Sequence, residues 1–135
     1  MSHGFLLDTN ACVDYFTGRY PKVVARLQAS SPEDLFVSSV VVAELRYGAD
    51  HSARRRTNHT RIDVFVEEIE VLDFDLGAAA AYGRVRARLE EGGTPIGPND
   101  MLIAAHALSR RLTVVTDNTA EFRRVKGLKV ANWRR

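Results

Sequence analysis

The stretch GFLLDTNACVDYF, which spans residues 4–16, begins with an apolar run and then places a carboxylate at Asp8. Residues 4–7 are typical of a short buried strand, and residues 11–18 are typical of a helix closed by a glycine. A strand that ends on Asp-Thr-Asn has two interpretations. These residue types commonly cap helices, so Asp8 could form no more than a turn. Asp8 could also belong to a functional site, and the rest of the chain decides between the two.

The alternation of strand and helix continues along the whole chain and predicts a parallel sheet with helices on both faces, an α/β fold. Neither an internal repeat nor a second domain is evident, so residues 1–135 are predicted to form a single domain. The predicted strands are 4–7, 35–38, 70–74, 112–116 and 128–130. The predicted helices are 11–18, 21 to about 30, one capped by Ser39 that ends near Gly48, 54 to about 68, one capped by Asp75 that runs to Gly92, one capped by Asn99 that runs to 111, and one or two helical turns over 118–124.

The composition is that of an ordinary globular domain, with 45% hydrophobic and 27% charged residues. The single cysteine, Cys12, excludes an intrachain disulfide and a cysteine-based zinc cluster, and it suits a reducing compartment. The sequence shows no leader-peptide pattern and no apolar run of about 18 residues. We therefore expect a cytoplasmic protein without a membrane span.

The basic residues are mostly arginine: 16 of the 19 are Arg and 3 are Lys, with a net charge of +2. The planar fork of arginine fits phosphate, so this bias permits nucleic-acid binding without establishing it. The densest basic stretch spans residues 53–61. Its four arginines could contact phosphates or could form an ordinary solvated helix end: Arg54, Arg55, Arg56 and Arg61.

Four acidic residues, far apart in the sequence, are expected at one edge of the predicted sheet. Asp8 ends the first strand, and Asp117 ends the strand at 112–116. Glu44 lies early in the helix after the second strand, and Asp100 lies in the first turn of a helix that follows a loop. The carboxyl ends of parallel strands meet at one edge of a sheet, where ligands collect. We therefore expect these four carboxylates to converge.

Converging carboxylates repel each other, and burying them is costly unless a cation compensates. All-oxygen ligands suit a hard ion such as Mg²⁺ or Mn²⁺. Two such ions, roughly 3.5–4 Å apart, can activate a water and hold a phosphodiester oxygen. Each acid also has an ordinary structural explanation as a cap, as a partner of the helix dipole or as a solvated side chain.

Other chemical motifs are absent. The loop GGTPIGP (residues 92–98) lacks the Lys-Ser/Thr pair of a phosphate-binding P-loop. No Gly-x-Ser-x-Gly motif is present, and Cys12 has no evident partner base. The histidines show no paired metal-ligand spacing: His3, His51, His59 and His106.

Four segments together resemble the PIN-domain family and, within it, the VapC-type toxins of toxin–antitoxin pairs. They are LLDTN at the start, VVAELRYGA at 41–49, GPNDMLIAAHA at 97–107 and LTVVTDNTAEFRRVKGLKVANW at 112–133, and they follow the family's order. The resemblance spans nearly the whole chain. It implies a compact α/β/α endoribonuclease that uses Mg²⁺ or Mn²⁺ held by carboxylates.

The resemblance also implies roles for particular residues. The family's metal-binding and catalytic carboxylates match Asp8, Glu44 and Asp100, and the fourth matches Asp117. Asp117 stands one place earlier than in the family's T-x-D pattern, which leaves Asn118 beside it as the alternative. The residues expected to orient these ligands through hydrogen bonds are Asn10 and Thr116.

Partners follow from the same resemblance. Family members form homodimers, and a VapB-type antitoxin neutralises them by laying a segment across the toxin groove. The segment from Asn118 to Trp133 resembles the toxins that cut initiator tRNA in its anticodon region. We therefore expect an RNA substrate, with tRNA as the best candidate, and no membrane partner.

Two other function classes share this fold pattern. A phospho-acceptor signalling domain needs an acidic pair near the first strand and a late lysine, whereas this chain has Asp-Thr-Asn there and only Lys126 and Lys129 late in the sequence. A non-catalytic RNA- or protein-binding module would not need all four acids. Fold alone excludes neither alternative.

Overall fold

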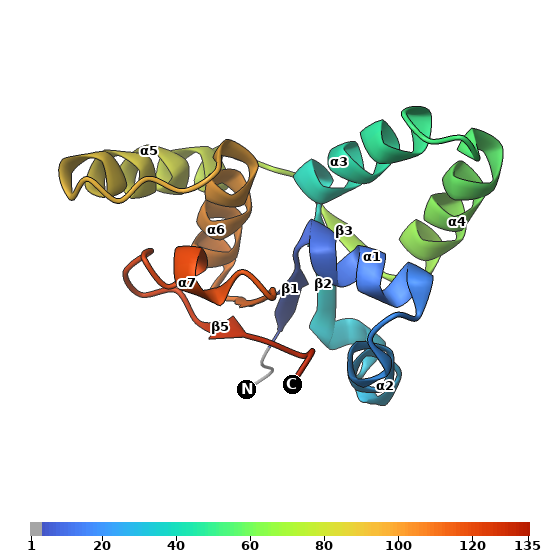
Figure 1. Cartoon of the computed structure of the whole chain (residues 1–135). Coiled ribbons are helices and arrows are strands. Elements are labelled where there is room, and N and C mark those ends of the chain that lie inside the picture. The colour runs from blue at the N-terminus through green and yellow to red at the C-terminus, as the bar shows by residue number, and fades with distance from the viewer. Residues whose placement is uncertain (1–3) are drawn as a thin grey trace.

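The computed structural model describes residues 4–135 and contains a five-stranded sheet with the strand order β3-β2-β1-β4-β5 (Figure 1). All four strand pairings are parallel. The α/β fold predicted from the sequence is confirmed. The strands are β1 (Phe5–Leu7), β2 (Leu35–Ser38), β3 (Glu70–Leu72), β4 (Thr113–Val115) and β5 (Val130–Ala131).

The helices lie in two layers that sandwich the sheet. Helices α1 to α4 lie on one side, and α5 to α7 lie on the other (Figure 1). This division follows from right-handed crossovers, because the chain moves one way along the sheet from β1 to β3 and then returns to β4. The helices are α1 (Thr9–Thr17), α2 (Pro21–Ala29), α3 (Ser39–Asp50), α4 (Arg55–Glu68), α5 (Leu76–Glu91), α6 (Pro98–Arg110) and α7 (Thr119–Phe122), with a 3₁₀ turn at Pro32–Asp34.

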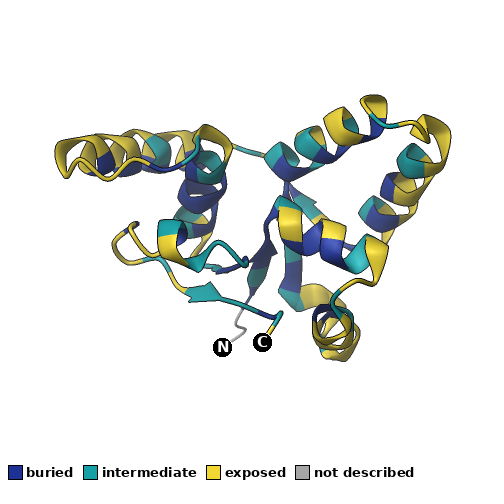
Figure 2. Ribbon diagram, viewed as in Figure 1, coloured by how far each residue is buried: buried dark blue, intermediate teal, exposed yellow. Residues whose placement is uncertain are grey.

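The core explains why the central strands are apolar without alternation. Helices cover both faces of β1 and its neighbours, so consecutive residues such as Leu6 and Leu7 are both fully buried. Val37 of β2 and Val114 of β4 are also fully buried. The helices bury one stripe each and expose the opposite side (Figure 2). None of the helices in the described part of the chain is long and apolar enough to cross a bilayer.

The order of the strands creates a switch point between β1 and β4. The connection after β1 leads to β2 on one side, whereas the chain reaches β4 on the other side only after crossing back from β3. Open α/β sheets bind ligands at the carboxyl ends of the strands at such a point. The backbone stays paired there, since the N–H of Asp8 donates to the carbonyl of Val115 at 3.0 Å.

Several predicted element boundaries were wrong by a few residues. Helix α3 is capped by Ser38 rather than Ser39. The backbone of Ser38 is extended, and its hydroxyl accepts a hydrogen bond from the Val40 N–H at 3.1 Å. The helix also continues through Gly48 to Asp50, since an isolated glycine near a helix end is tolerated.

Two further boundaries differ near the other end of the chain. Helix α6 begins at Pro98, so Asn99 lies inside its first turn and does not cap it. Proline suits this position because the first helical N–H has no partner within the helix. Strand β5 lies at Val130–Ala131 rather than at 128–130. Residues 1–3, which include His3, lie outside the described residues.

Candidate active site

Asp8 lies where β1 meets α1, and both interpretations of its position hold. Its Oδ1 accepts a hydrogen bond from the Ala11 N–H at 2.8 Å, so the side chain caps α1. The same residue is only 3% exposed and faces other carboxylates of the site. A cap residue needs no burial of this degree, which makes the location unusual for a simple turn.

The surroundings of Asp8 raise its pKa to about 7. Burial is the main cause, since desolvation disfavours the charged carboxylate, and repulsion from Asp100 and Asp117 adds to it. Hydrogen bonds from the Thr116 side chain and the Ala11 backbone partly offset this increase. Asp8 is therefore a carboxylate whose charged form lacks sufficient compensation from the protein.

Asp100 occupies the first turn of α6, where the helix dipole favours a negative charge. The side-chain amide of Asn118 donates to its Oδ2 at 3.3 Å and lowers the pKa. Burial is the larger effect, and together with repulsion from neighbouring acids it raises the pKa above the ordinary range. These acids, in decreasing order of their effect, are Glu121, Glu44 and Asp117.

Glu44 and Asp117 reach the same edge of the sheet from two other elements. Glu44 lies on α3, half-buried, and its Oε1 accepts from the Thr9 hydroxyl at 2.8 Å. Asp117 follows β4, and its Oδ1 accepts from the Asn10 side-chain amide at 3.1 Å. The structure therefore brings all four predicted acids to one edge, and both Asn10 and Thr116 contact one of them.

Glu121 is a fifth acid at this edge, and the sequence reasoning missed it. It lies in the first turn of the short helix α7, and its Oε2 accepts from the Asn118 amide at 2.6 Å. Asn118 thus bridges Glu121 and Asp100. The sequence does contain an indication of this position, because a glutamate three residues after a capping residue such as Asn118 is common at the start of a helix. The helix predicted over 118–124 was too short and too poorly defined for this spacing to be used.

The donor set fits a hard divalent cation. The acids are oxygen ligands, they repel one another, and burial disfavours the charge of Asp8 and Asp100. Among residues 4–135, no group of three or more His, Cys, Asp or Glu side chains is arranged so that it could by itself hold a metal ion. Mg²⁺ does not require such a group, because it keeps several waters and is commonly bound through one or two carboxylates.

Comparison with known proteins identifies the family. Residues 5–128 match the model of the PIN domain. The chain is 43% identical over 129 residues to the tRNA(fMet)-specific endonuclease VapC of Shigella flexneri, covering 96% of this chain and 97% of that one. It is 37% identical over 131 residues to ribonuclease VapC2 of Rickettsia felis, with the same coverage. The chain belongs to the PIN-domain family, in its VapC group.

Solved structures agree with this assignment. The DNA-bound VapBC structure from Salmonella typhimurium superimposes with a TM-score of 0.91 at 38% identity, covering 97% of this chain and 98% of that chain. The predicted resemblance to VapC-type toxins is therefore confirmed. Membership of the PIN-domain family also disfavours the phospho-acceptor alternative.

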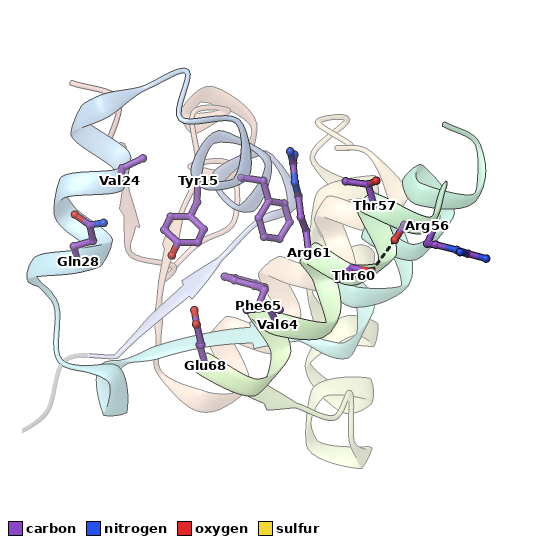
Figure 3. Close-up of a pocket in the computed structure, with 11 residues that line it drawn as sticks. Tyr15, Val24, Gln28, Arg56, Thr57, Thr60, Arg61, Val64, Phe65 and Glu68 are labelled. Carbon is purple, nitrogen blue, oxygen red and sulfur yellow. Dashed lines mark hydrogen bonds between the residues drawn. The ribbon is translucent and has the colours of Figure 1, made fainter. Parts of the chain in front are cut away.

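This VapC-group chain also has a groove of about 790 Å³ between α1, α2 and α4 (Figure 3). Tyr15, Phe16 and Phe65 form aromatic walls, and Arg61 lies at the rim. A second cavity of about 330 Å³ shares Phe16 and Arg61 with the groove and is also lined by Thr9 and Glu44. The groove therefore leads towards the acidic edge.

The four arginines predicted to contact RNA have different surroundings. Arg54, Arg55 and Arg56 are all exposed at the start of α4, and Arg55 donates to Asp50 at 3.0 Å. Arg61 lies further along the same helix and lines both cavities. Of the four, only Arg61 shares a cavity with a site acid.

Proposed function

We propose that this chain is the toxin of a VapBC-type pair and an endoribonuclease that hydrolyses RNA phosphodiester bonds with Mg²⁺ or Mn²⁺. The observation that carries the proposal is the convergence of carboxylates from β1, α3, α6 and the end of β4 at the switch point of the sheet. Support also comes from relatives named as ribonucleases or tRNA(fMet)-specific endonucleases.

The cation would be held by Asp8 and Asp100, with Glu44, Asp117 and Glu121 around it. When bound, the ion supplies positive charge for a phosphate and makes a water molecule more acidic. It would also offset the burial and repulsion that raise the pKa of Asp8. Glu121 is linked to Asp100 through Asn118, whose side-chain amide donates to both carboxylates.

The chain's own hydrogen bonds would set the orientation of these carboxylates. The backbone of α1 and the hydroxyl of Thr116 hold Asp8, and Asn118 holds Asp100 between α6 and α7. Thr9 fixes Glu44 from the first turn of α1. Such preorganisation lowers the reorganisation needed when charge develops on a phosphate in the transition state.

For the substrate we propose tRNA, with the anticodon region of initiator tRNA as the specific target. The name of the Shigella flexneri relative supports this choice. Arg61 is the arginine best placed to meet a phosphate next to the scissile bond, because it shares a cavity with Glu44. Arg54, Arg55 and Arg56 would contact more distant parts of the RNA backbone.

For the partner we propose a VapB-type antitoxin, because the similar solved structures include VapBC complexes. The aromatic groove offers an apolar seat for one segment of such a partner, and its continuation leads that segment to the acids. An antitoxin arginine could then pair with the carboxylates in place of a metal ion. We further propose that the toxin forms a homodimer and acts in the cytoplasm.

The test is cleavage of a total tRNA pool by the purified protein, freed of any antitoxin, with Mg²⁺, with Mn²⁺ or with EDTA. One discrete product that requires the cation is expected, and sequencing its ends identifies the RNA and the bond. Purified initiator tRNA should be cut far faster than elongator methionine tRNA. If both tRNAs are cut equally, the target is wrong, and if no RNA is cut with either cation, the nuclease proposal fails.

A further inference from the structure

The last residues of the chain are held firmly against the fold. Trp133 is only 4% exposed and packs edge-on against Phe5, with ring centroids 5.0 Å apart. The guanidinium of Arg26 lies over the Trp133 ring at 5.0 Å. The Asn132 side chain accepts from the backbone N–H of Arg134 at 3.0 Å. These contacts direct the Arg134 side chain back towards α1.

Arg134 joins two carboxylates with one guanidinium. Its Nε and Nη2 donate to the two oxygens of Asp14 at 2.7 and 3.0 Å, and its Nη1 donates to Asp117 Oδ2 at 3.0 Å. The guanidinium also lies 3.9 Å above the ring of Tyr20. Because the Asp14 side chain is only 7% exposed, this is a part-buried ion pair rather than a solvated surface contact.

The bridge has a direct consequence for Asp117. One of its oxygens accepts from Asn10 at 3.1 Å and the other accepts from Arg134 at 3.0 Å. A cation that bound Asp117 directly would have to compete with the hydrogen bonds that fix the orientation of its carboxylate. The guanidinium also places a permanent positive charge beside carboxylates that repel one another.

We propose that Arg134 is a positioning residue that holds Asp117 out of the metal ligands and weakens the binding of divalent cations at the neighbouring acids. This inference rests on the cation site of the proposed function. Asp14 and Tyr20 hold the guanidinium in place, and Asp117 accepts a hydrogen bond from it. The C-terminal tail thereby lowers the affinity of the site for the cation.

An ordinary structural role makes a different prediction. If the bridge only fastens the C-terminus, its loss lowers stability and either leaves cation affinity unchanged or weakens it through disorder. If Arg134 supplies charge and restrains Asp117, its loss tightens cation binding in a protein that is still folded. The direction of the change in affinity therefore separates the two roles.

The experiment is calorimetric titration of the metal-free full chain with Mn²⁺, comparing wild type, Arg134→Gln and Arg135→Gln. Arg135 is exposed and makes none of these contacts, so Arg135→Gln removes an equal charge from the same tail. We expect Arg134→Gln to lower the Kd for Mn²⁺ about three- to tenfold, the size of effect expected for one nearby unit charge. Arg135→Gln should change the Kd less than twofold, on the order expected for a screened surface charge.

A double variant guards against misfolding. Arg134→Gln leaves the buried Asp14 without its partner, whereas Asp14→Asn combined with Arg134→Gln leaves no unpaired charge at that position. The double variant should still bind Mn²⁺ more tightly than wild type, although less so than Arg134→Gln alone, because it also loses the negative charge of Asp14. In an Asp117→Asn background, Arg134→Gln should tighten binding less than it does in the wild-type background, because only the effect of its charge remains.

Three results would overturn the proposal. An unchanged or higher Kd in the folded Arg134→Gln and double variants would mean that the bridge only holds the C-terminal tail against the fold. Undiminished tightening in the Asp117→Asn background would mean that Arg134 does not act through Asp117. Absence of Mn²⁺ binding in wild type itself would instead refute the cation site of the proposed function, and this inference would fall with it.

Discussion

Asp8 illustrates how one residue combines structural and chemical tasks. Its carboxylate caps α1 through Ala11, which stabilises the fold, yet its burial and its acidic neighbours raise its pKa to about 7. The fold thus maintains a carboxylate in an environment that disfavours its charge. Such an arrangement is common at functional sites, because a buried carboxylate whose charged form is destabilised readily binds a cation or a proton.

The raised pKa predicts how stability changes with pH in EDTA. The folded state holds the Asp8 proton up to about pH 7, whereas the unfolded chain releases it near the ordinary value of 3.8. The folded state therefore binds more protons between these values, and stability from this group is lost as pH rises through that window. Between about pH 5 and pH 7.5, Asp8→Asn should gain stability relative to wild type by a few kcal/mol.

The measurement is the free energy of unfolding by urea at several pH values. The lowered pKa of His106 acts in the opposite direction, since burial disfavours its charged form and stability is lost as pH falls through its usual range. His106 is present in both proteins, so the difference between wild type and Asp8→Asn removes its contribution. A difference that does not change with pH would contradict the assignment of this titration to Asp8.

At the scale of elements, the ends of helices and strands position the site. Glycine and serine set several of these ends: Gly18 ends α1 with a left-handed conformation at φ 66°, and Ser38 caps α3. Ser38 also contacts His106 Nδ1 at 2.8 Å, which ties the start of α3 to α6. The acids carried by α3 and α6 therefore depend on these boundaries.

Two glycine substitutions compare a helix end with a helix interior. Gly18→Ala should destabilise the protein by about 1–2 kcal/mol, because a β-carbon disfavours the left-handed conformation. Gly83→Ala should stabilise it by about 0.5–1 kcal/mol, because Gly83 lies exposed inside α5 with open space around it. Urea unfolding measures both, and equal signs for the two changes would contradict the account.

The elements themselves could be predicted from the sequence because their patterns are local. Breaker residues and caps such as Asp75 and Gly18 marked the ends of helices correctly, and apolar runs marked the strands. One of the errors fell where two neighbouring residues compete for one role. Ser38 and Ser39 are chemically identical candidates for a cap, and only the backbone conformation distinguishes them.

At the scale of the whole molecule, topology creates the candidate site. The switch between β1 and β4 brings together acids that lie up to 113 positions apart, from Asp8 to Glu121. The convergence of the four expected acids could be foreseen. Asp8 and Asp117 end predicted strands that share one carboxyl edge, and Glu44 and Asp100 lie early in helices at that edge. Glu121 and the Arg134 bridge could not, since α7 and the tail follow no strong local pattern and depend on contacts that close only in the fold.

The most direct test of the central claim is an acid-to-amide scan of RNA cleavage with saturating Mn²⁺. Folded variants would be compared at Asp8, Glu44, Asp100 and Glu121, with Glu67→Gln on the exposed part of α4 as the matched control. We predict that Asp8→Asn and Asp100→Asn each lose on the order of 100-fold or more in kcat/KM, the loss typical when a charge-stabilising group leaves an active site. Glu121→Gln should lose about tenfold or more, and Glu67→Gln should match wild type. Cleavage that survives unchanged in Asp8→Asn and Asp100→Asn would show that the acidic edge is not the catalytic centre.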